Sequence, residues 1–292
     1  MTASNDPPVA AVTGASGYLG SRIARELETT GWRVLRLVRT AEPGNPGERW
    51  FDAAEPVADG LLDSVDLLVH AAYDLTVTNR EDIWRINVEG TRRLLDAASR
   101  AGVGRIIVLS SMSAYDGTSQ LYGRAKLEIE DATFAVGGCA IRPGIVFGPQ
   151  AGGMTGALRK LTHLPLVPLV AADVRLYFVS EVDLVRAVAA LAVAETSPAT
   201  PIGIAFPSPV RFRDFMQKLA TSEGRRPRFF PFPWRVLYLI LRAAETLRLP
   251  LPFRADSLLA LAKPAPSLPG LAELEALGVV PTMSPLSPGV EP

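Results

Sequence analysis

The sequence of 292 residues contains a single cysteine, Cys139, and two histidines, His70 and His163. One cysteine excludes an intrachain disulfide framework and a cysteine-based zinc site, and two histidines are too few for a multi-histidine metal site. Lysine and arginine total 30, as do aspartate and glutamate, so no excess of positive charge attracts nucleic acid. We therefore expect neither a metal centre nor a nucleic-acid partner.

Long apolar runs are also absent from the sequence. No stretch of about 18 or more uncharged apolar residues occurs, which excludes an obvious transmembrane helix. Residues 1–8 are polar and contain proline, unlike the basic and then apolar plan of a signal peptide. Hydrophobic residues make up 48% of the chain, enough for a sizeable core in one large domain or two small ones. We expect a soluble, cytoplasmic protein.

Short β-rich runs alternate with helical runs in the first half of the chain. Strands alternating with helices predict parallel βαβ units, and hence an α/β fold with a doubly wound parallel sheet. The expected strands are residues 9–13, 33–38, 49–52, 65–70, 105–109 and 139–142, and the expected helices are residues 16–30, 80–101 and 121–134.

A glycine-rich turn joins the first expected strand to the first expected helix. Gly14 permits the tight turn, Gly17 lets the backbone approach a pyrophosphate, and Gly20 lets the helix pack closely on the strand. Exposed amides at the start of the helix, together with its dipole, favour phosphate groups. Because the turn lies between a strand and a helix of a βαβ unit, it predicts a dinucleotide-binding site.

The end of the second expected strand discriminates between the two nicotinamide cofactors. An acid about 20 residues past the turn holds the ribose of NAD, whereas a nearby arginine accommodates the 2′-phosphate of NADP. Residues 34–39 contain no acid, and Arg39, assisted by Arg36, is placed for the phosphate unless both are plain surface arginines. The sequence thus favours NADP over NAD. Asp52, after the third strand, is either an adenine contact or a turn aspartate.

Tyr122 and Lys126 are four residues apart in an expected helix and therefore share one face. An ammonium group beside a phenol stabilises the phenolate and lowers the phenol pKa from about 10, which makes Tyr122 a candidate general acid/base. Ser111 follows the fifth expected strand, at the edge where open α/β sheets bind ligands. Its hydroxyl is placed to hold a substrate oxygen.

These motifs resemble those of the short-chain dehydrogenases/reductases of the extended, epimerase/dehydratase-like type. The resemblance covers nearly the whole chain and is densest before residue 150. It implies a Rossmann fold with a small substrate-binding region near the C-terminus, and a homodimer formed through two long helices. The matching segments are TGASGYLG (13–20), VDLLVHAA (65–72), NVEGTRRLLDAA (87–98), RIIVLSS (105–111), YGRAK (122–126), IRPGIVFGP (141–149), YFVSEVDLVRAV (177–188) and LGVVPTMSPLSPGV (277–290).

The resemblance also implies roles for individual residues. Ser111, Tyr122 and Lys126 would be catalytic, and Lys126 would also hold the nicotinamide ribose. Asn87 would be a helix asparagine near the active site, or else a buried structural amide. The residues expected to contact the cofactor are Gly14, Ser16, Gly17, Tyr18, Leu19, Arg39, Asp52, Ala71, Ala72, Asn87, Lys126 and Pro143.

Three departures from the family pattern narrow the expected reaction. Met112 and Ser113 stand where 4,6-dehydratases carry an Asp-Glu pair, and Ile145 stands where nucleotide-sugar enzymes carry an asparagine. Only eleven residues separate Ser111 from Tyr122, so the pocket rim is expected to be small or open. We expect an NAD(P)-dependent oxidoreductase that acts on a carbonyl or secondary alcohol. The alternatives are a nucleotide-sugar epimerase with tightly bound NAD and a non-catalytic NADP-binding sensor or assembly subunit.

The amino-acid composition changes after Pro143, where glycine, proline and leucine become the dominant residues. We expect a dinucleotide-binding domain over residues 1–143, with segments near 177–206 returning to it. Residues 175–179 are expected to form a further strand. Residues 144–292 are expected to form a mainly helical substrate region and a Pro-rich tail. The apolar stretch 229–253 is expected to be a helix that covers the substrate region, or else to form a lipophilic substrate tunnel or a membrane-surface helix. Tyr73 and Tyr115 either line the pocket or are half-buried surface aromatics.

Overall fold

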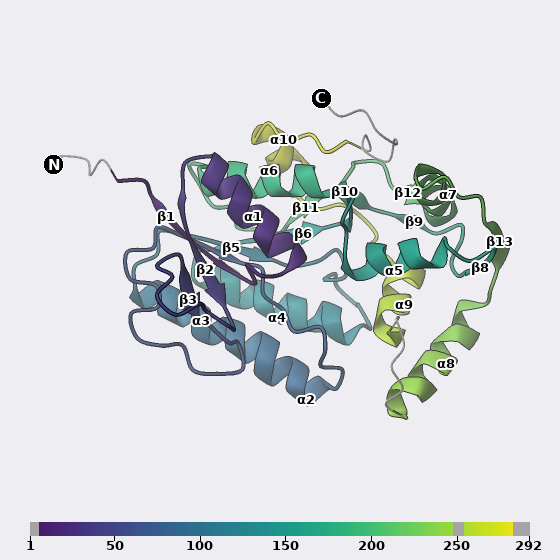
Figure 1. Ribbon diagram of the computed structural model, residues 1–292, viewed down its shortest axis with the longest axis horizontal. Coiled ribbons are helices and arrows are strands. Elements are labelled where there is room, and N and C mark those ends of the chain that lie inside the picture. Colours follow the sequence, from purple (N-terminus) through teal and green to yellow (C-terminus); the bar gives the residue numbers. More distant parts are fainter. Residues whose placement is uncertain (1–5, 248–253, 283–292) are drawn as a thin grey trace.

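The computed structural model describes residues 6–247 and 254–282, and within them a seven-stranded parallel sheet forms the centre of the molecule (Figure 1). The strand order is β11-β6-β5-β4-β1-β2-β3. Strands β2 and β3 follow on one side of β1 and the later strands follow on the other, and this switch leaves a crevice at the carboxyl ends of β1 and β4. The predicted doubly wound parallel sheet is confirmed. The strands are β1 Val9–Thr13, β2 Arg33–Val38, β3 Glu48–Trp50, β4 Leu67–His70, β5 Arg105–Leu109, β6 Cys139–Pro143 and β11 Ile202–Ile204.

Helices cover both faces of this sheet (Figure 1). On one face α1 (Tyr18–Thr29) packs against α6 (Glu181–Ala192). On the other face lie α3 (Glu89–Arg100) and α4 (Leu121–Ala135). The single helix expected over 80–101 is α2 (Arg80–Asp82), a π-helical turn at Ile83–Val88 and α3 in succession.

Burial on both faces explains the uninterrupted apolar strands. Leu67 and Val69 of β4 belong to the core under α1 and α6, whereas Leu68 belongs to the core under α3 and α4, and all three are fully buried. Successive side chains of a strand point to opposite faces, so a strand covered on both sides requires apolar residues at every position.

After Pro143 the chain leaves the sheet, returns through α6 and β11, and leaves it again. The expected strand over 175–179 is in fact two strands in different sheets, because β9 pairs with β12 and β10 pairs with β7. Phe147, Phe178 and Phe215 form a separate core between these elements. The elements are β7 Ile145–Phe147, α5 Gly153–Leu161, β8 Leu166–Leu169, β9 Arg175–Leu176, β10 Phe178–Ser180, β12 Val210–Arg211, α7 Phe212–Ser222 and β13 Arg228–Pro231.

Three further helices follow, α8 (Trp234–Thr246), α9 (Ala255–Ala262) and α10 (Leu271–Ala276). The expected Pro-rich tail therefore contains a short helix, which packs beside β11. Arg248 and the rest of 248–253 lie outside the described residues, as do residues 283–290 of the C-terminal motif. Among the described residues, no helix is both long and apolar enough to cross a membrane.

Candidate active site

The glycine-rich turn has the geometry of a phosphate cradle. Gly14 has a positive φ of 66°, and the N–H of Gly17 donates to the Gly14 carbonyl at 2.8 Å. A Cβ atom on Gly20 would lie 2.1 Å from that same carbonyl oxygen, so only glycine fits there. Helix α1 begins at Tyr18, and the N–H groups of Tyr18 and Leu19 have no acceptor within the helix. Together with the helix dipole, these amides favour an anion.

We expect Gly20→Ala to lower the free energy of unfolding by about 2 kcal/mol, because the backbone of the turn must move to admit the methyl group. Urea denaturation of the purified protein measures this change. Arg25→Ala, at an exposed position of the same helix, is the control and should alter stability by less than about 0.5 kcal/mol. An unchanged Gly20→Ala protein would show that the turn is not closely packed.

His70 belongs to a buried hydrogen-bond chain and not to the pocket. Thr13 Oγ1 accepts from the N–H groups of Ala71 and Ala72 at 3.0 and 3.1 Å, so its own proton is donated to His70 Nδ1 at 2.8 Å. The His70 Nε2 proton is then donated to Thr91 Oγ1 at 2.9 Å. Burial lowers the pKa of His70 to about 3. The imidazole is therefore a neutral bridge between β1, β4 and α3.

Asn87 holds the loop that follows β4. Its side-chain oxygen accepts from the N–H of Asp74 at 2.7 Å, and its amide donates to the Asp74 carbonyl at 3.3 Å. The residue is 3% exposed and does not line the pocket. Asn87 thus holds the loop that carries Tyr73, a residue of the pocket lining.

A cavity of about 670 Å³ joins the glycine-rich turn to the expected catalytic residues. Nine of the expected site residues line it, whereas Ser16, Arg39, Asp52, Ala72 and Asn87 do not. The nine are Gly14, Gly17, Tyr18, Leu19, Ala71, Ser111, Tyr122, Lys126 and Pro143.

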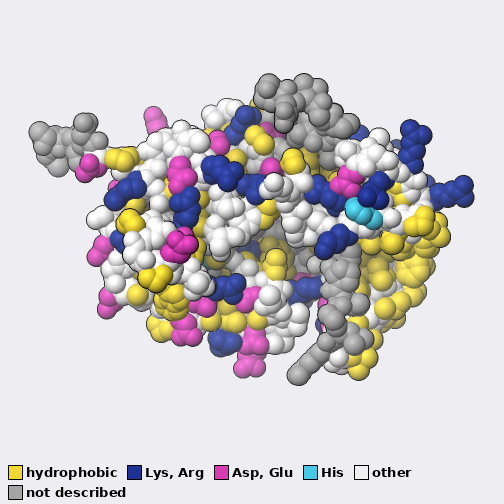
Figure 2. Space-filling view, viewed as in Figure 1, with side chains coloured by type: hydrophobic (Ala, Val, Ile, Leu, Met, Phe, Trp, Pro, Cys, Tyr) yellow, Lys and Arg dark blue, Asp and Glu magenta, His cyan; other side chains and the backbone are white. Residues whose placement is uncertain are grey.

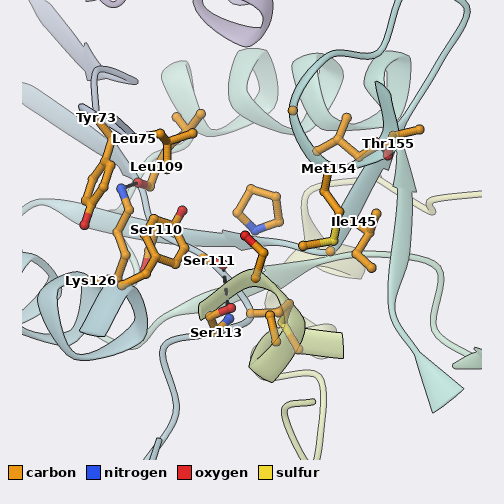
Figure 3. Close-up of a pocket in the computed structure, with 18 of the residues that line it drawn as sticks. Tyr73, Leu75, Leu109, Ser110, Ser111, Ser113, Lys126, Ile145, Met154 and Thr155 are labelled. Carbon is orange, nitrogen blue, oxygen red and sulfur yellow. Dashed lines mark hydrogen bonds between the residues drawn. The ribbon is translucent and has the colours of Figure 1, made fainter. Parts of the chain in front are cut away.

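Lys126 and two tyrosines form one wall of this cavity. Lys126 Nζ donates to the Leu109 carbonyl at 2.6 Å and lies 4.5 Å from the centre of the Tyr73 ring. The Tyr73 and Tyr122 rings meet edge to face, with centres 4.9 Å apart. Figure 3 shows Lys126 beside Tyr73 on one side of the cavity and Ile145 across from them. The fold therefore brings a phenol, an ammonium group and the Ser111 hydroxyl to the same pocket.

The electrostatics of this wall differ from the sequence expectation. Burial raises the pKa of Tyr122 to about 12, and the Asp256 carboxylate adds to the rise, while the Ser111 hydroxyl opposes it. Burial also lowers the pKa of Lys126 to about 7. Sequence spacing predicts a lowered pKa for Tyr122, but Lys126 is itself desolvated and directed at a carbonyl, so it does not stabilise the phenolate. In the structure the phenol is protonated at neutral pH.

Asp256, on α9, was not anticipated from the sequence. Its Oδ2 accepts from the N–H of Tyr122 at 3.0 Å and its Oδ1 accepts from the N–H of Leu121 at 3.2 Å. The carboxylate therefore caps α4, whose N-terminal residue Gln120 offers no side-chain cap. The two partners are 134 residues apart, and no local motif signals the contact.

We expect Asp256→Asn to shift the alkaline limb of any Tyr122-dependent reaction towards lower pH. The carboxylate raises the pKa of Tyr122, so removing its charge lowers that pKa and deprotonates the phenol earlier as the pH rises. A pH profile of turnover measures the shift. Asp173→Asn, on a loop remote from α4, is the matched control. An unmoved limb would show that Asp256 acts only as a cap.

The two residues expected to bind the adenosine half of the cofactor lie beyond the cavity. Arg39 is exposed directly after β2, whereas the Arg36 side chain forms an ion pair with Glu28 at 2.7 Å. Asp52 Oδ1 accepts from the N–H of Ala54 at 2.9 Å, so Asp52 also stabilises its own turn.

The far side of the cavity is mainly apolar and comes from segments after Pro143. Of the two alternatives for Tyr73, the structure shows the first: Tyr73 lines the cavity, and its hydroxyl has no hydrogen-bond partner among the described residues. Tyr115 lies outside the lining, and its hydroxyl donates to the Lys263 carbonyl at 2.9 Å. The apolar lining includes Ile145, Met154, Leu176, Ala260 and Leu261. Across residues 6–247 and 254–282, no three His, Cys, Asp or Glu side chains are grouped to hold a metal ion.

Comparison with known proteins finds relatives of several activities. The ceramide reductase of Caulobacter vibrioides is 28% identical over 243 residues, which cover 77% of this chain and 74% of that protein. The solved structure of MoeE5 with UDP-glucuronic acid and NAD has a TM-score of 0.65 and 26% identity, covering 77% of this chain and 85% of that one. The UDP-glucose 4-epimerase of Thermus thermophilus, with a TM-score of 0.67 and 18% identity over 96% of each chain, shares the fold.

The sequence model of the NAD dependent epimerase/dehydratase family matches residues 10–200. This span contains the glycine-rich turn, Ser111, Tyr122 and Lys126, and it includes most of the central sheet. The chain belongs to the NAD dependent epimerase/dehydratase family.

Proposed function

We propose that this protein is an NADP-preferring reductase that converts a carbonyl group of a lipophilic substrate to a secondary alcohol. The proposal rests on one observation: Ser111, Tyr122 and Lys126 line a cavity that extends from a phosphate cradle to an apolar wall. The family includes enzymes of several reaction types, so the choice of reaction is argued from this site.

The residues present fit a dinucleotide. The positive φ of Gly14, the space that Gly20 leaves beside it and the free amides at the start of α1 form a cradle for a pyrophosphate. Lys126 and Ala71 lie further along the same cavity, where the nicotinamide end would be held. The bound cofactor supplies the hydride, and the protein orients the substrate and donates the proton to its oxygen.

Tyr122 is suited to donate that proton. Its pKa lies well above 7, so the phenol is protonated at neutral pH, which is the form that a reduction requires at the developing alkoxide. Ser111 is placed to donate a hydrogen bond to the same oxygen and to hold it beside the phenol. Lys126, with a pKa near 7, is poised to exchange a proton with its surroundings once the phenol has donated its own.

The substrate class follows from the opposite wall. Ile145 and Met154 face the catalytic side of the cavity (Figure 3), and Leu261 of α9 adds to this apolar surface. Such a lining favours an alkyl chain over a sugar. The unpartnered hydroxyl of Tyr73 offers one polar contact near the reacting carbonyl. The relative named ceramide reductase, similar over 77% of this chain, supports a lipid-like ketone.

Arg39 carries the proposed preference for NADP. We expect Arg39→Ser to weaken NADPH binding by about tenfold to a hundredfold and to leave NADH binding nearly unchanged, because a charge-assisted contact to the 2′-phosphate is lost. Fluorescence titration of both cofactors measures this. Arg33→Ser, at the exposed opposite end of β2, is the control. Equal weakening of both cofactors would remove Arg39 from the 2′-phosphate site.

A nucleotide-sugar epimerase is the second candidate. The similarity to MoeE5, a structure with UDP-glucuronic acid and NAD, favours it. Ile145 disfavours it, because it stands where nucleotide-sugar enzymes carry an asparagine and cannot hydrogen-bond a diphosphate. Besides Lys126, the cations that line the described cavity, Arg254 and Lys263, are beside α9.

The deciding experiment is cofactor titration followed by a substrate screen. The purified protein is titrated with NADPH and NADH, and any bound nucleotide is assayed after denaturation. Exchangeable NADPH together with turnover of long-chain ketones would support the reductase. Tightly retained NAD would support the epimerase, and binding of neither cofactor would overturn both candidates.

A further inference from the structure

Helix α8 is apolar on two faces, and within residues 6–247 and 254–282 only one of them is packed against other elements. The inner face carries Leu241 and Ala244, which are 5% and 7% exposed. Leu241 packs with Val170, Ala255 and Leu258 in a small core between α8, α9 and the end of β8. This packing accounts for one apolar stripe of the helix.

The outer face of α8 consists of Val236, Leu239 and Ile240 and is continued by Leu247, directly after the helix; these residues are 47, 67, 50 and 70% exposed. Positions separated by three, four, seven and eleven residues lie along one side of a helix, so these four side chains form a continuous stripe. No described residue covers it. Scattered single apolar residues are normal on a protein surface, whereas a continuous stripe indicates a partner.

Arginines border this apolar surface. Arg235 and Arg242 are seven residues apart, along one edge of the outer face, and both are exposed. Arg226 and Arg228 are exposed in the segment that leads into α8. The acid of the helix, Glu245, is directed at the Ala255 N–H at 2.8 Å and at Arg242 at 3.4 Å. Figure 2 shows the apolar surface at the lower right, with basic side chains at its upper end.

The outer face lies behind one wall of the pocket. Helix α8 packs against α9, and α9 supplies Ser257, Ala260 and Leu261 to the lining of the cavity. The two-helix unit thus presents one side to the cavity and the other to the surroundings.

We propose that the outer face of α8 docks this protein onto the surface of a bilayer that contains anionic lipids. An apolar stripe bordered by arginines matches the two parts of such a surface, since acyl chains receive the apolar residues and anionic headgroups pair with the guanidinium groups. The helix lies along the interface. This docking is independent of the reaction proposed above, but it would bring the α9 wall of the cavity close to lipids.

Vesicle co-sedimentation of the full chain tests the docking. We expect binding to phosphatidylcholine vesicles with about 30% phosphatidylglycerol to exceed binding to pure phosphatidylcholine by about tenfold. Leu239→Ser/Ile240→Ser should weaken binding to the anionic vesicles by about tenfold or more. Both side chains are exposed, so the variant keeps its fold. Val193→Ser, whose side chain is 71% exposed at the end of α6, is the matched control and should bind as the parent does.

A second variant tests the contribution of the arginine charges separately from that of the apolar stripe. Arg235→Gln/Arg242→Gln should reduce the preference for anionic over neutral vesicles, while residual binding to both persists through the apolar stripe. Raising the salt concentration should also reduce the preference of the parent protein for anionic over neutral vesicles. The same change in salt should alter the preference of this variant less.

Three results would overturn the proposal. The first is no binding to anionic vesicles, and the second is binding that Leu239→Ser/Ile240→Ser leaves unchanged. The third is a dimer in light scattering that the same substitution converts to monomer, since the stripe would then be covered by a second copy of the chain. Turnover of a short, water-soluble ketone should be the same in the parent and both α8 variants, so failure of docking is distinguishable from failure of the proposed reaction.

Discussion

Tyr122→Phe is expected to lower turnover by about a thousandfold while cofactor affinity stays within twofold of the parent. The substitution removes the hydroxyl that donates the proton. It keeps the ring, which packs against Tyr73 with centres 4.9 Å apart, so the wall of the cavity is preserved. Steady-state kinetics on a substrate from the ketone screen, with parallel titration of NADPH, measures the two effects separately.

Tyr115→Phe is the matched control for this experiment. Its hydroxyl donates to the Lys263 carbonyl at 2.9 Å and lies outside the cavity lining, so turnover should change by less than about threefold. Near-normal turnover in Tyr122→Phe would remove Tyr122 from the mechanism. Equal losses in turnover and in cofactor affinity would instead show that the substitution had disturbed the pocket.

Lys126→Met is expected to abolish most turnover and at the same time to stabilise the cofactor-free protein. Lys126 is 3% exposed, and burial lowers its pKa from 10.5 in the unfolded chain to about 7. Below pH 7 the lysine is protonated in both states, so the folded protein bears the full cost of a desolvated ammonium group. Methionine fills a similar volume without that cost, and the gain at pH 6 is on the order of 3 kcal/mol.

The sign of the pH dependence follows from the same pKa values. Between pH 7 and pH 10.5 the unfolded chain binds a proton that the folded protein does not, so the stability of the parent rises with pH over this range. The advantage of Lys126→Met should therefore shrink by about 3 kcal/mol between pH 6 and pH 9, the equivalent of about two pKa units. Urea denaturation of both proteins at the two pH values measures it.

Lys218→Met provides the control for loss of a lysine. Lys218 is exposed on α7, and its replacement should change stability by less than about 0.5 kcal/mol at either pH. A Lys126→Met protein less stable than the parent at pH 6 would mean that the Leu109 hydrogen bond and the tyrosine rings outweigh the cost of burying the ammonium group.

Expectations that depend on short stretches of chain agree well with the structure. The strands at 9–13, 33–38 and 105–109 have the bounds that their apolar runs predict. The glycine-rich turn forms a cradle because its conformation is decided within a few residues, by φ at Gly14 and by the space left at Gly20. Tyr122 and Lys126 share a helix face for the same local reason.

Expectations that depend on the surroundings of a residue agree less well with the structure. Spacing alone suggests a lowered pKa for Tyr122, but burial and the charge of Asp256 raise it. The stretch 175–179 reads as one strand because Leu, Tyr, Phe and Val follow one another after Arg175, yet Leu176 and Phe178 lie in strands with different partners. The domain boundary at Pro143, the homodimer and the roles of the site residues stay predictions.

The sequence by itself determined the parallel sheet, the conformation of the glycine-rich turn and the placing of Tyr122 and Lys126 on one helix face. Each of these depends on the periodicity or conformation of a few neighbouring residues. Only the tertiary structure decided the protonation of Tyr122, the capping of α4 by Asp256 from 134 residues away, and the exposure of one apolar face of α8. Desolvation and long-range contacts are properties of the folded surroundings, and no local pattern encodes which distant segment will supply them.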